Sequence, residues 1–374
     1  MKVTSVVLTA MGLPRPYADS RPVEVMELDL SGPQAGELLV RVEASGLCHS
    51  DLSVVDGSRP RPLPMALGHE AAGIVEEIGA GVHDVAVGDR VVLVFVPSCG
   101  SCPECSSGQP ALCRRGAASN TAGELLQGGR RLSRDGSPVH HHLGVSAFSS
   151  HVVVDRGSAV VVPSNVPGDT AALFGCALLT GTGAVESTVQ VRPGDSVVVV
   201  GLGGVGLSAV MGAALAGADP LVVVDPVEAK RALALSLGAS HAVVPGSVDE
   251  VRELTGGGAR YVVEAVGHEQ AMADAFAMTG RGGSTVLVGL PHPSRMLSVP
   301  AVQVVAEARK VLGSYMGSAA PQRDIPRLVR LWQDGRLPVE RLTSAVLSLE
   351  DTPRALDDLA AGTAVRQLLL PRRD

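Results

Sequence analysis

At 374 residues the chain is too long for one ordinary domain and suits two. Hydrophobic residues make up 45% of it but aromatic residues only 2%, so the core must consist of Val, Leu and Ala, as in buried parallel strands and their covering helices. The net charge of −7, without any basic run, argues against a nucleic-acid partner and favours a soluble, cytoplasmic protein.

The N-terminal segment MKVTSVVLTAMGLPRPYADS makes a poor signal peptide, because Thr, Gly and Pro break its short apolar run. It predicts a first strand instead. From residue 3 to residue 95, short Val-rich runs alternate with Gly and Pro. This pattern predicts an antiparallel β-rich domain that resembles a barrel.

A candidate catalytic metal site lies between Cys48 and Glu70. A catalytic zinc typically has three protein ligands and one open position, and it accepts thiolate sulfur and imidazole nitrogen. Cys48 and His69 would supply two ligands, and Cys176 is the candidate for the third because the other four cysteines cluster elsewhere. For each residue alone, a buried free cysteine or an ordinary core histidine is the alternative interpretation.

The other four cysteines lie in the polar loop 97–113; they are Cys99, Cys102, Cys105 and Cys113. The loop has little apolar area with which to fold, and a closed four-thiolate zinc site would supply the missing stability. A disulfide pair is one alternative, but nothing marks the chain as secreted. An iron–sulfur cluster is the other, but the chain has no second cluster motif.

Three adjacent histidines, His140, His141 and His142, look like a metal-binding tract. Successive side chains of a strand point to opposite faces, so at most two of them could share a face. We therefore do not expect a metal site in this run.

The stretch 196–224 is long and apolar, but glycines interrupt it and both ends are strand-like, so we expect no membrane span. It predicts a strand, a Gly-x-Gly-x-x-Gly turn at Gly201, Gly203 and Gly206, an Ala-rich helix and a second strand. The second strand ends at Asp225, about 20 positions on, as a dinucleotide fingerprint requires.

The glycines would let the backbone close on the pyrophosphate at the helix N-terminus. The Asp225 carboxylate would accept hydrogen bonds from the adenosine ribose and repel a 2′-phosphate, which favours NAD over NADP. A glycine-rich turn without a ligand is the alternative. Further strands at 259–267 and 284–290 continue a doubly wound parallel sheet, and the tail from about residue 315 is expected to rejoin the first domain.

Together these motifs resemble the zinc-dependent medium-chain alcohol dehydrogenases over essentially the whole chain. The motifs are GHEAAGIVEEIGAGV, the four-cysteine loop, GCALLTGTGA and GLGGVGLS, and the loop ending in VHHHLGVSAFSSHVVVD is similar to the subgroup of animal alcohol dehydrogenases and glutathione-dependent formaldehyde dehydrogenases. The resemblance implies an α/β fold. Residues 1–178 and 315–374 would form a β-rich, GroES-like catalytic domain, and residues 179–314 a Rossmann domain.

The resemblance also implies roles for individual residues. Cys48, His69 and Cys176 would hold a catalytic zinc, Glu70 could approach that metal, and Asp51 would orient the ligand histidine. The expected dinucleotide contacts are His49, Thr180, Gly201, Gly203, Gly204, Val205, Gly206, Asp225 and Arg366. The expected substrate pocket comprises Phe95, His142, Leu143, Leu290 and Tyr315.

Proton transfer would begin at Ser50, which stands where the family keeps a Ser or Thr hydroxyl that takes the substrate proton. Many relatives have a histidine three residues later as the last protein group before solvent, and this chain has Ser53 there. We expect a relay that water completes.

The implied activity is a reversible, NAD-linked oxidation of a primary alcohol to an aldehyde, with one catalytic and one structural zinc in each chain of a homodimer or homotetramer. Because His142 and Tyr315 are polar where ethanol-oxidising relatives are apolar, a medium-sized aromatic or allylic substrate is expected. A thiol-adduct (S-hydroxymethyl) formaldehyde dehydrogenase is an alternative that Arg115 would suit, although the basic segment GSRPRPL lacks the acidic residues expected there. A non-enzymatic zinc- and dinucleotide-binding protein is a further alternative, against which the presence of Ser50 and Glu70 argues.

Overall fold

The computed structural model describes residues 1–371 and divides the chain into two compact units. Of the described residues, the first unit comprises 1–176 and 320–371, and the second comprises 177–319. The boundaries expected from the sequence differ from these by two residues at the first crossing and by five at the second. Both ends of the chain therefore contribute to one unit, and the middle of the chain forms the other.

A closed barrel forms one part of the first unit, with strand order β1-β2-β7-β8-β4. Its strands are β1 (Lys2–Leu8), β2 (Val23–Leu30), β4 (Met65–Ala66), β7 (Leu132–Arg134) and β8 (Ser137–His141). Val3 and Val7 point the same way from β1 because side chains alternate along a strand, and they share one buried cluster with Leu28 and Leu30 of β2. The predicted barrel-like β domain is confirmed.

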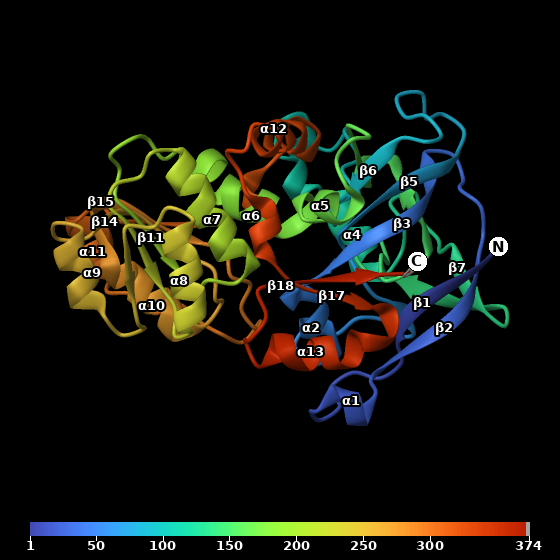
Figure 1. The fold of residues 1–374 in the computed structure, drawn as a ribbon, viewed down its shortest axis with the longest axis horizontal. Coiled ribbons are helices and arrows are strands. Elements are labelled where there is room, and N and C mark those ends of the chain that lie inside the picture. The colour runs from blue at the N-terminus through green and yellow to red at the C-terminus, as the bar shows by residue number, and fades with distance from the viewer. Residues whose placement is uncertain (372–374) are drawn as a thin grey trace. The chain divides into compact units, whose positions relative to one another are not determined.

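A larger sheet completes the first unit, with order β10-β6-β5-β3-β18-β17 and with β9 also paired to β3. Its strands are β3 (Glu37–Leu47), β5 (Ala71–Ile78), β6 (Arg90–Leu93), β9 (His151–Asp155), β10 (Ala159–Val162), β17 (Thr343–Ser348) and β18 (Arg366–Leu370). The C-terminal strand β18 runs antiparallel to β3, with Gln367 opposite Leu47, and Figure 1 shows β17 and β18 beside β3. The predicted return of the tail to the first domain follows from this pairing.

Helices and short turns separate the strands of the first unit along the chain. They are α1 (Tyr17–Ser20), α2 (His49–Val55), α3 (Pro103–Ser106), α4 (Arg114–Ala122), α5 (Gly168–Ala172), α12 (Pro321–Gln333) and α13 (Thr352–Ala360). Short 3₁₀ turns are η1 (Pro110–Leu112), η2 (Arg156–Ser158), η6 (Val339–Leu342) and η7 (Leu349–Asp351), and η3 (Phe174–Leu178) is a π-helical turn. Leu52 and Val55 of α2 share a buried cluster with Leu356 of α13, so the two helices pack together.

A six-stranded parallel sheet forms the centre of the second unit, in the order β13-β12-β11-β14-β15-β16 over the described residues. Its strands are β11 (Val197–Val200), β12 (Leu221–Val224), β13 (His241–Val243), β14 (Ala259–Glu264), β15 (Thr279–Leu287) and β16 (Lys310–Gly313). Its helices are α6 (Leu179–Gly183), α7 (Gly204–Leu215), α8 (Glu228–Ser236), α9 (Val248–Leu254), α10 (Glu269–Met278) and α11 (Ala301–Ala306), with the turns η4 (Ala184–Thr188) and η5 (Met316–Ser318). Figure 1 shows α7 to α10 around this sheet.

The order of this sheet reverses between β11 and β14, because the chain moves outward from β11 to β13 and then returns to pair β14 on the other side of β11. This is a doubly wound sheet with a switch point at β11, where ligands of such sheets bind beyond the carboxyl ends of the strands. All residues of β11 and β12 are buried, as the Val-rich sequence predicts for central parallel strands.

The apolar stretch 196–224 folds as the strand β11, the helix α7 and the strand β12. Among residues 1–371, no helix combines the length and the apolar character that crossing a bilayer would need.

Candidate active site

Four side chains with metal-binding atoms lie together in the first unit: Cys48, His69, Glu70 and Cys176. Their ligand atoms all lie within 4.8 Å of one another. Cys48 caps the N-terminus of α2, His69 and Glu70 immediately precede β5, and Cys176 belongs to the π-helical turn η3. Residues that are 21 and 107 positions apart in sequence are thus brought to one place by the fold.

The position of His69 depends on the glycine that precedes it. Gly68 has a φ of +92°, a conformation that residues with a Cβ rarely adopt. A Cβ on Gly68 would lie 2.4 Å from the backbone nitrogen of Phe148. Glycine therefore lets the chain turn tightly against the neighbouring segment and direct His69 toward Cys48 and Cys176.

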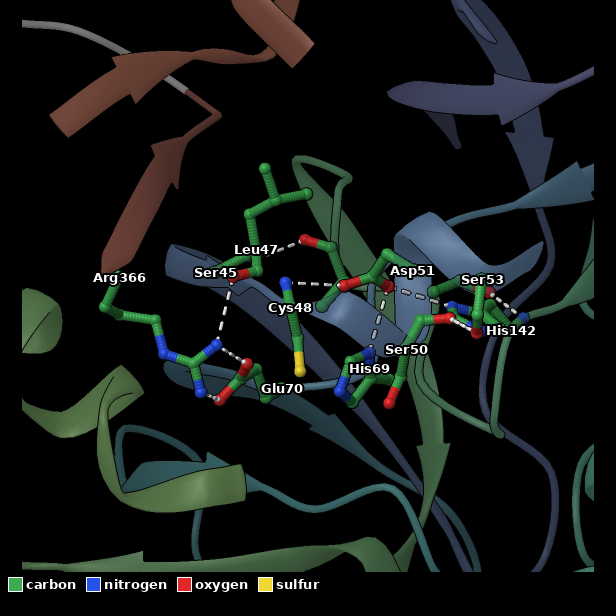
Figure 2. A network of polar contacts seen from close by, with 12 residues as sticks. Ser45, Leu47, Cys48, Ser50, Asp51, Ser53, His69, Glu70, His142 and Arg366 are labelled. Carbon is green, nitrogen blue, oxygen red and sulfur yellow. Dashed lines mark hydrogen bonds and ion pairs between the residues drawn. The ribbon is translucent and has the colours of Figure 1, made fainter. Parts of the chain in front are cut away.

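The imidazole of His69 is oriented by Asp51, whose Oδ1 lies 2.9 Å from Nδ1 of the ring (Figure 2). Oδ2 of the same carboxylate accepts a hydrogen bond from the backbone N–H of Cys48, at 3.0 Å. With its proton on Nδ1, the ring presents an unprotonated Nε2, and this atom is buried and has no hydrogen-bond partner among the described residues. A buried nitrogen lone pair between two cysteine sulfurs is a donor set that suits Zn²⁺.

The two sulfurs influence each other. A hydrogen bond from the Cys176 thiol, together with His69 and the charge of Arg366, holds the pKa of Cys48 well below its ordinary value. The same bond to Cys48, with burial, raises the pKa of Cys176 well above its ordinary value. The site thus favours a thiolate at Cys48 even in the metal-free protein, and a metal would replace the thiol proton that the two sulfurs share.

Glu70 forms a buried ion pair with Arg366 of β18, with Nη1 2.9 Å from Oε1 and Nη2 3.1 Å from Oε2 (Figure 2). Nη1 also donates to the carbonyl oxygen of Leu47 at 3.0 Å. Burial raises the pKa of Glu70 to about 7, although the charge of Arg366 opposes this rise. The sequence did not predict this ion pair, because Arg366 enters the site only through the pairing of β18 with β3.

The four cysteines of the loop 97–113 form a second cluster, with their sulfurs within 4.8 Å of one another. The Cys102 and Cys113 sulfurs are 3.9 Å apart, and all of these cysteines are free thiols, so the disulfide alternative is not what the structure contains. Backbone N–H groups donate to two of the sulfurs: Cys102 to Cys99 at 3.3 Å, and Gly116 to Cys113 at 3.4 Å. Such bonds stabilise thiolates, and four of them at tetrahedral spacing fit a zinc ion.

The glycine fingerprint occupies the switch point of the second unit. Gly201 follows β11 with a φ of +88°, and α7 begins at Gly204. A Cβ on Gly206 would lie 1.8 Å from the carbonyl oxygen of Gly201, so only glycine allows this helix to start so close to the strand. At Gly203 a Cβ would have no protein atom within 4 Å, so the backbone there is open for a pyrophosphate to approach.

Comparison with known proteins agrees with these features. Residues 34–164 match the family model described as an alcohol dehydrogenase GroES-like domain, and residues 204–334 match the model of a zinc-binding dehydrogenase. An NDMA-dependent alcohol dehydrogenase of Amycolatopsis methanolica is 39% identical over the full length of both chains. The chain belongs to the zinc-dependent alcohol dehydrogenase family. As a member it is an oxidoreductase that uses zinc and a nicotinamide dinucleotide, and the residues of both cysteine-containing clusters fit the metal.

Two further relatives have narrower names. An S-(hydroxymethyl)glutathione dehydrogenase of Paracoccus denitrificans is 36% identical, and the match covers 94% of this chain and 96% of that one. The solved structure of benzyl alcohol dehydrogenase from Acinetobacter calcoaceticus superimposes with a TM-score of 0.92 at 31% identity, covering 99% of each chain. Both relatives support the same family, and the substrates in their names differ.

Several predicted residues surround the catalytic cluster of this alcohol dehydrogenase. The Phe95 ring meets that of His69 edge-on, with centroids 5.6 Å apart and an interplanar angle of 86°. The His142 ring meets His69 in the same manner from another direction, at 5.6 Å and 83°. Leu143 follows directly, half-buried, with a φ of +50°.

The candidate relay residues lie in α2. His49 and Ser50 begin the helix immediately after Cys48. The hydroxyl of Ser53 donates to the backbone carbonyl of Ser50 at 2.8 Å, so the hydroxyl proton of Ser53 is engaged in a hydrogen bond within the helix.

The remaining predicted residues lie in the second unit. Thr180 is in α6, which packs closely on α7, since a Cβ on Gly181 would lie 2.2 Å from the carbonyl oxygen of Val205. Leu290 and Tyr315 are exposed, at 53% and 41%. Their predicted membership of the substrate pocket stays a prediction.

Asp225 directly follows β12, at the edge of the sheet where the fingerprint lies. Its Oδ2 accepts the N–H of Leu202 at 2.7 Å, and its Oδ1 accepts that of Val227 at 2.8 Å. These bonds orient the carboxylate and hold it next to the glycine turn. Each carboxylate oxygen can accept more than one hydrogen bond, so capacity remains for ribose hydroxyls.

The run of three histidines separates into different environments. His140 contacts Arg130 at the surface, with Nε of the arginine 3.0 Å from Nδ1. His141 is buried, its Nε2 accepts the N–H of Arg131 at 3.0 Å, and burial with the charge of Arg131 lowers its pKa to about 3. Neither belongs to a cluster of metal-binding groups within residues 1–371, whereas His142 lies beside Asp51 and His69.

Proposed function

We propose that this alcohol dehydrogenase oxidises a medium-sized primary alcohol, aromatic or allylic, to its aldehyde with NAD as the hydride acceptor. The observation that carries the proposal is the cluster of Cys48, His69 and Cys176 with the orphaned Nε2 of His69, on a chain whose family is zinc-dependent. Bound zinc supplies a Lewis acid that acidifies an alcohol and polarises an aldehyde. The bound nicotinamide supplies the hydride acceptor or donor.

The protein's own groups would position the reactants and move the proton. We assign the first proton transfer to the hydroxyl of Ser50, at the start of α2 beside Cys48. Because the proton of Ser53 is already donated to the carbonyl of Ser50, its hydroxyl oxygen can accept a proton through water but does not donate onward in this arrangement. We therefore assign the end of the relay to water and cofactor hydroxyls.

Asp51 would hold His69 in the tautomer that leaves Nε2 free. The ion pair of Glu70 and Arg366 would determine the electrostatic charge next to the metal-binding side chains. Since Arg366 is only 3% exposed and paired with Glu70, contact of its guanidinium with the pyrophosphate would require it to share its donors between the carboxylate and the cofactor. His49 is the second residue that we assign to the pyrophosphate.

We assign NAD rather than NADP on the charge of Asp225. Its carboxylate is buried, is fixed by two backbone N–H groups and lies beside the glycine turn. A 2′-phosphate brought to this place would meet a fixed negative charge, whereas the free 2′-hydroxyl of NAD would donate to it.

The substrate class rests on the side chains next to His69. Phe95 offers an aromatic edge and His142 a polar ring. An aromatic or allylic alcohol would place its π system against Phe95. The similarity to a benzyl alcohol dehydrogenase supports this substrate class.

A second candidate substrate is the adduct of formaldehyde with a thiol such as glutathione, which the similarity to an S-(hydroxymethyl)glutathione dehydrogenase supports. Arg115 at the start of α4 would suit its carboxylates. A purified chain should therefore be assayed by absorbance at 340 nm with NAD and benzyl alcohol, cinnamyl alcohol, ethanol and S-hydroxymethylglutathione.

We expect kcat/KM for benzyl or cinnamyl alcohol to exceed that for ethanol by about tenfold or more, as an apolar pocket discriminates by one to three kcal/mol per group. A preference for S-hydroxymethylglutathione would select the second candidate. Equal rates with ethanol would refute the assigned substrate class. If a chain that holds zinc oxidised none of these substrates with NAD, the non-enzymatic alternative, which the family assignment disfavours, would return.

We also propose that the enzyme acts in the cytoplasm as a homodimer or homotetramer. The strand β16 ends the parallel sheet, and the nearby residues Met296, Val302 and Val305 are 77%, 70% and 83% exposed. An open strand edge with exposed apolar side chains is typical of an interface. Light scattering of the wild type and of V305D would test this, since a charge in the interface should dissociate the assembly.

A further inference from the structure

Two histidines approach one carboxylate oxygen behind the candidate catalytic centre. Nδ1 of His69 lies 2.9 Å from Oδ1 of Asp51, and Nδ1 of His142 lies 3.1 Å from the same oxygen (Figure 2). Asp51 is fully buried, and both histidines are only 1% exposed. The second contact joins the residue after β8 to α2. The sequence did not predict it, because there His142 was expected to line the substrate pocket.

The contact decides which nitrogen of His142 carries the proton. A histidine ring carries a hydrogen on at least one of its two nitrogens, whereas an ionised carboxylate only accepts hydrogen bonds. If Nδ1 were unprotonated, its lone pair would lie 3.1 Å from a carboxylate oxygen in a buried site, which is repulsive. The proton therefore lies on Nδ1, the ring nitrogen 3.1 Å from Asp51, in a close contact whose alignment falls short of a well-formed hydrogen bond.

Oδ1 of Asp51 thus faces two N–H groups. Each N–H draws electron density from the oxygen, so a donor from His142 weakens the bond that the same oxygen accepts from His69. A weaker bond to Nδ1 leaves Nε2 of His69 less basic, because the carboxylate partner of a ligand histidine is what raises its basicity. His142 would therefore act on the metal only through Asp51 and His69.

We propose that His142 is a positioning residue of the catalytic centre that competes with His69 for Asp51 and thereby limits how tightly His69 holds the metal. The inference rests on the proposed zinc site. A less electron-rich ligand leaves the zinc a stronger Lewis acid. The competition of His142 with His69 would therefore lower the affinity for the metal and raise the reactivity of the bound metal.

A separate metal ion held by Asp51, His69 and His142 is the alternative use of this group, whose ligand atoms also lie within 4.8 Å of one another. It is disfavoured because Asp51 approaches both imidazoles at hydrogen-bond distance, whereas ligands placed about 2.1 Å from one tetrahedral metal stand further apart. Binding there would also remove the proton by which Nδ1 of His69 contacts Asp51.

The test is the rate at which the purified holoenzyme releases zinc to a chromophoric chelator, which requires no substrate. The catalytic zinc is identified as the phase that is absent from C176S. We expect H142F and H142L, which remove the N–H, to slow this phase by about 3–10-fold, somewhat less than the effect of changing a direct partner of a ligand. H142Q, whose amide can donate to Asp51, should remain within about twofold of the wild type.

Two controls separate this role from general damage. H140F makes the same change on the neighbouring strand residue outside the site, and it should leave the release rate unchanged. In a D51N background, H142F should have no further effect, because the residue through which it acts has lost its charge.

Faster or unchanged zinc release in both H142F and H142L would overturn the proposal, as would a full effect of H142F in the D51N background. Zinc content of the wild type is measured first. If the wild type and C176S released zinc in the same phases, the proposed zinc site itself would be refuted. This result differs from a failure of the His142 proposal, in which the wild type shows the additional phase but the His142 variants do not slow it.

Discussion

Replacing Glu264 by glutamine should change the pH dependence of the second unit's stability. Glu264 ends β14, one strand from the glycine turn, and is fully buried. Its Oε1 accepts the N–H groups of Val266 and Gly267, at 2.8 and 2.7 Å, while Oε2 is buried without a partner. Burial raises the pKa of Glu264 to about 7, against the pull of those two N–H groups.

The magnitude follows from linkage. An unfolded glutamate titrates near 4.5, so between pH 4.5 and about 7 the folded protein keeps a proton that the unfolded chain has released. Stability of the wild type therefore falls as pH rises through this window and is constant above it. A shift of about 2.5 units corresponds to about 3 kcal/mol of lost stability. Glutamine does not ionise, so E264Q should lack this loss.

The assay is amide hydrogen exchange of peptides from β11 and β14 at pH 5, 6, 7 and 8, corrected for the intrinsic exchange rate at each pH. The free-energy difference between E264Q and the wild type should move by about 2.5 kcal/mol in favour of E264Q between pH 5 and pH 8, because part of the effect already lies below pH 5. Any cost of burying the glutamine amide is an offset that does not vary with pH.

The exposed Glu253 of α9 offers a matched control, since E253Q makes the same chemical change without burial. It should show no pH-dependent difference from the wild type. If the difference for E264Q were the same at pH 5 and pH 8, burial would not be holding the proton on Glu264. The reasoning would then be wrong.

Four other substitutions test the remaining features. G206A should destabilise the second unit by about 1–3 kcal/mol, because its Cβ would lie 1.8 Å from the Gly201 carbonyl oxygen. G203A should instead leave urea unfolding almost unchanged and weaken NAD binding measured by calorimetry. If the two variants affected stability and NAD binding equally, the assignment of Gly203 to the cofactor would be contradicted. C105S should lower the zinc content by about one ion per chain and lower Tm, because the loop folds around its metal, and an unaltered zinc content would exclude the four-thiolate site. S50A should lower kcat about 10²–10⁴-fold with an unchanged KM for NAD, and a near-normal kcat would remove Ser50 from proton transfer.

Much of the fold could be predicted because its signals are local. The fingerprint around Gly201 requires a strand, a tight turn and a helix in succession, and each has its own residue pattern. The Val-rich strands and the cysteine spacing of the loop 97–113 are equally local. The family resemblance then supplied the two-unit organisation that no local pattern contains.

The surroundings of the catalytic cluster could not be predicted in the same way. The ion pair of Glu70 with Arg366 exists because β18 pairs with β3, which joins residues 296 positions apart. The contact of His142 with Asp51 depends on where the chain turns after β8. No residue pattern in either segment indicates that two imidazoles approach one carboxylate oxygen. The raised pKa of Glu264 likewise depends on burial, although its place at the end of an apolar strand was a signal that could have drawn attention to it.

Residue types and their spacing thus determined which groups are available to this protein: six cysteine sulfurs, a Gly-x-Gly-x-x-Gly turn, and an acidic residue after the second strand. Tertiary structure alone decided which of these groups face one another and how far each is buried from solvent. The physical reason is that ligand basicity, pKa and ion pairing depend on distance and solvent, and both are set by contacts between segments far apart in the chain.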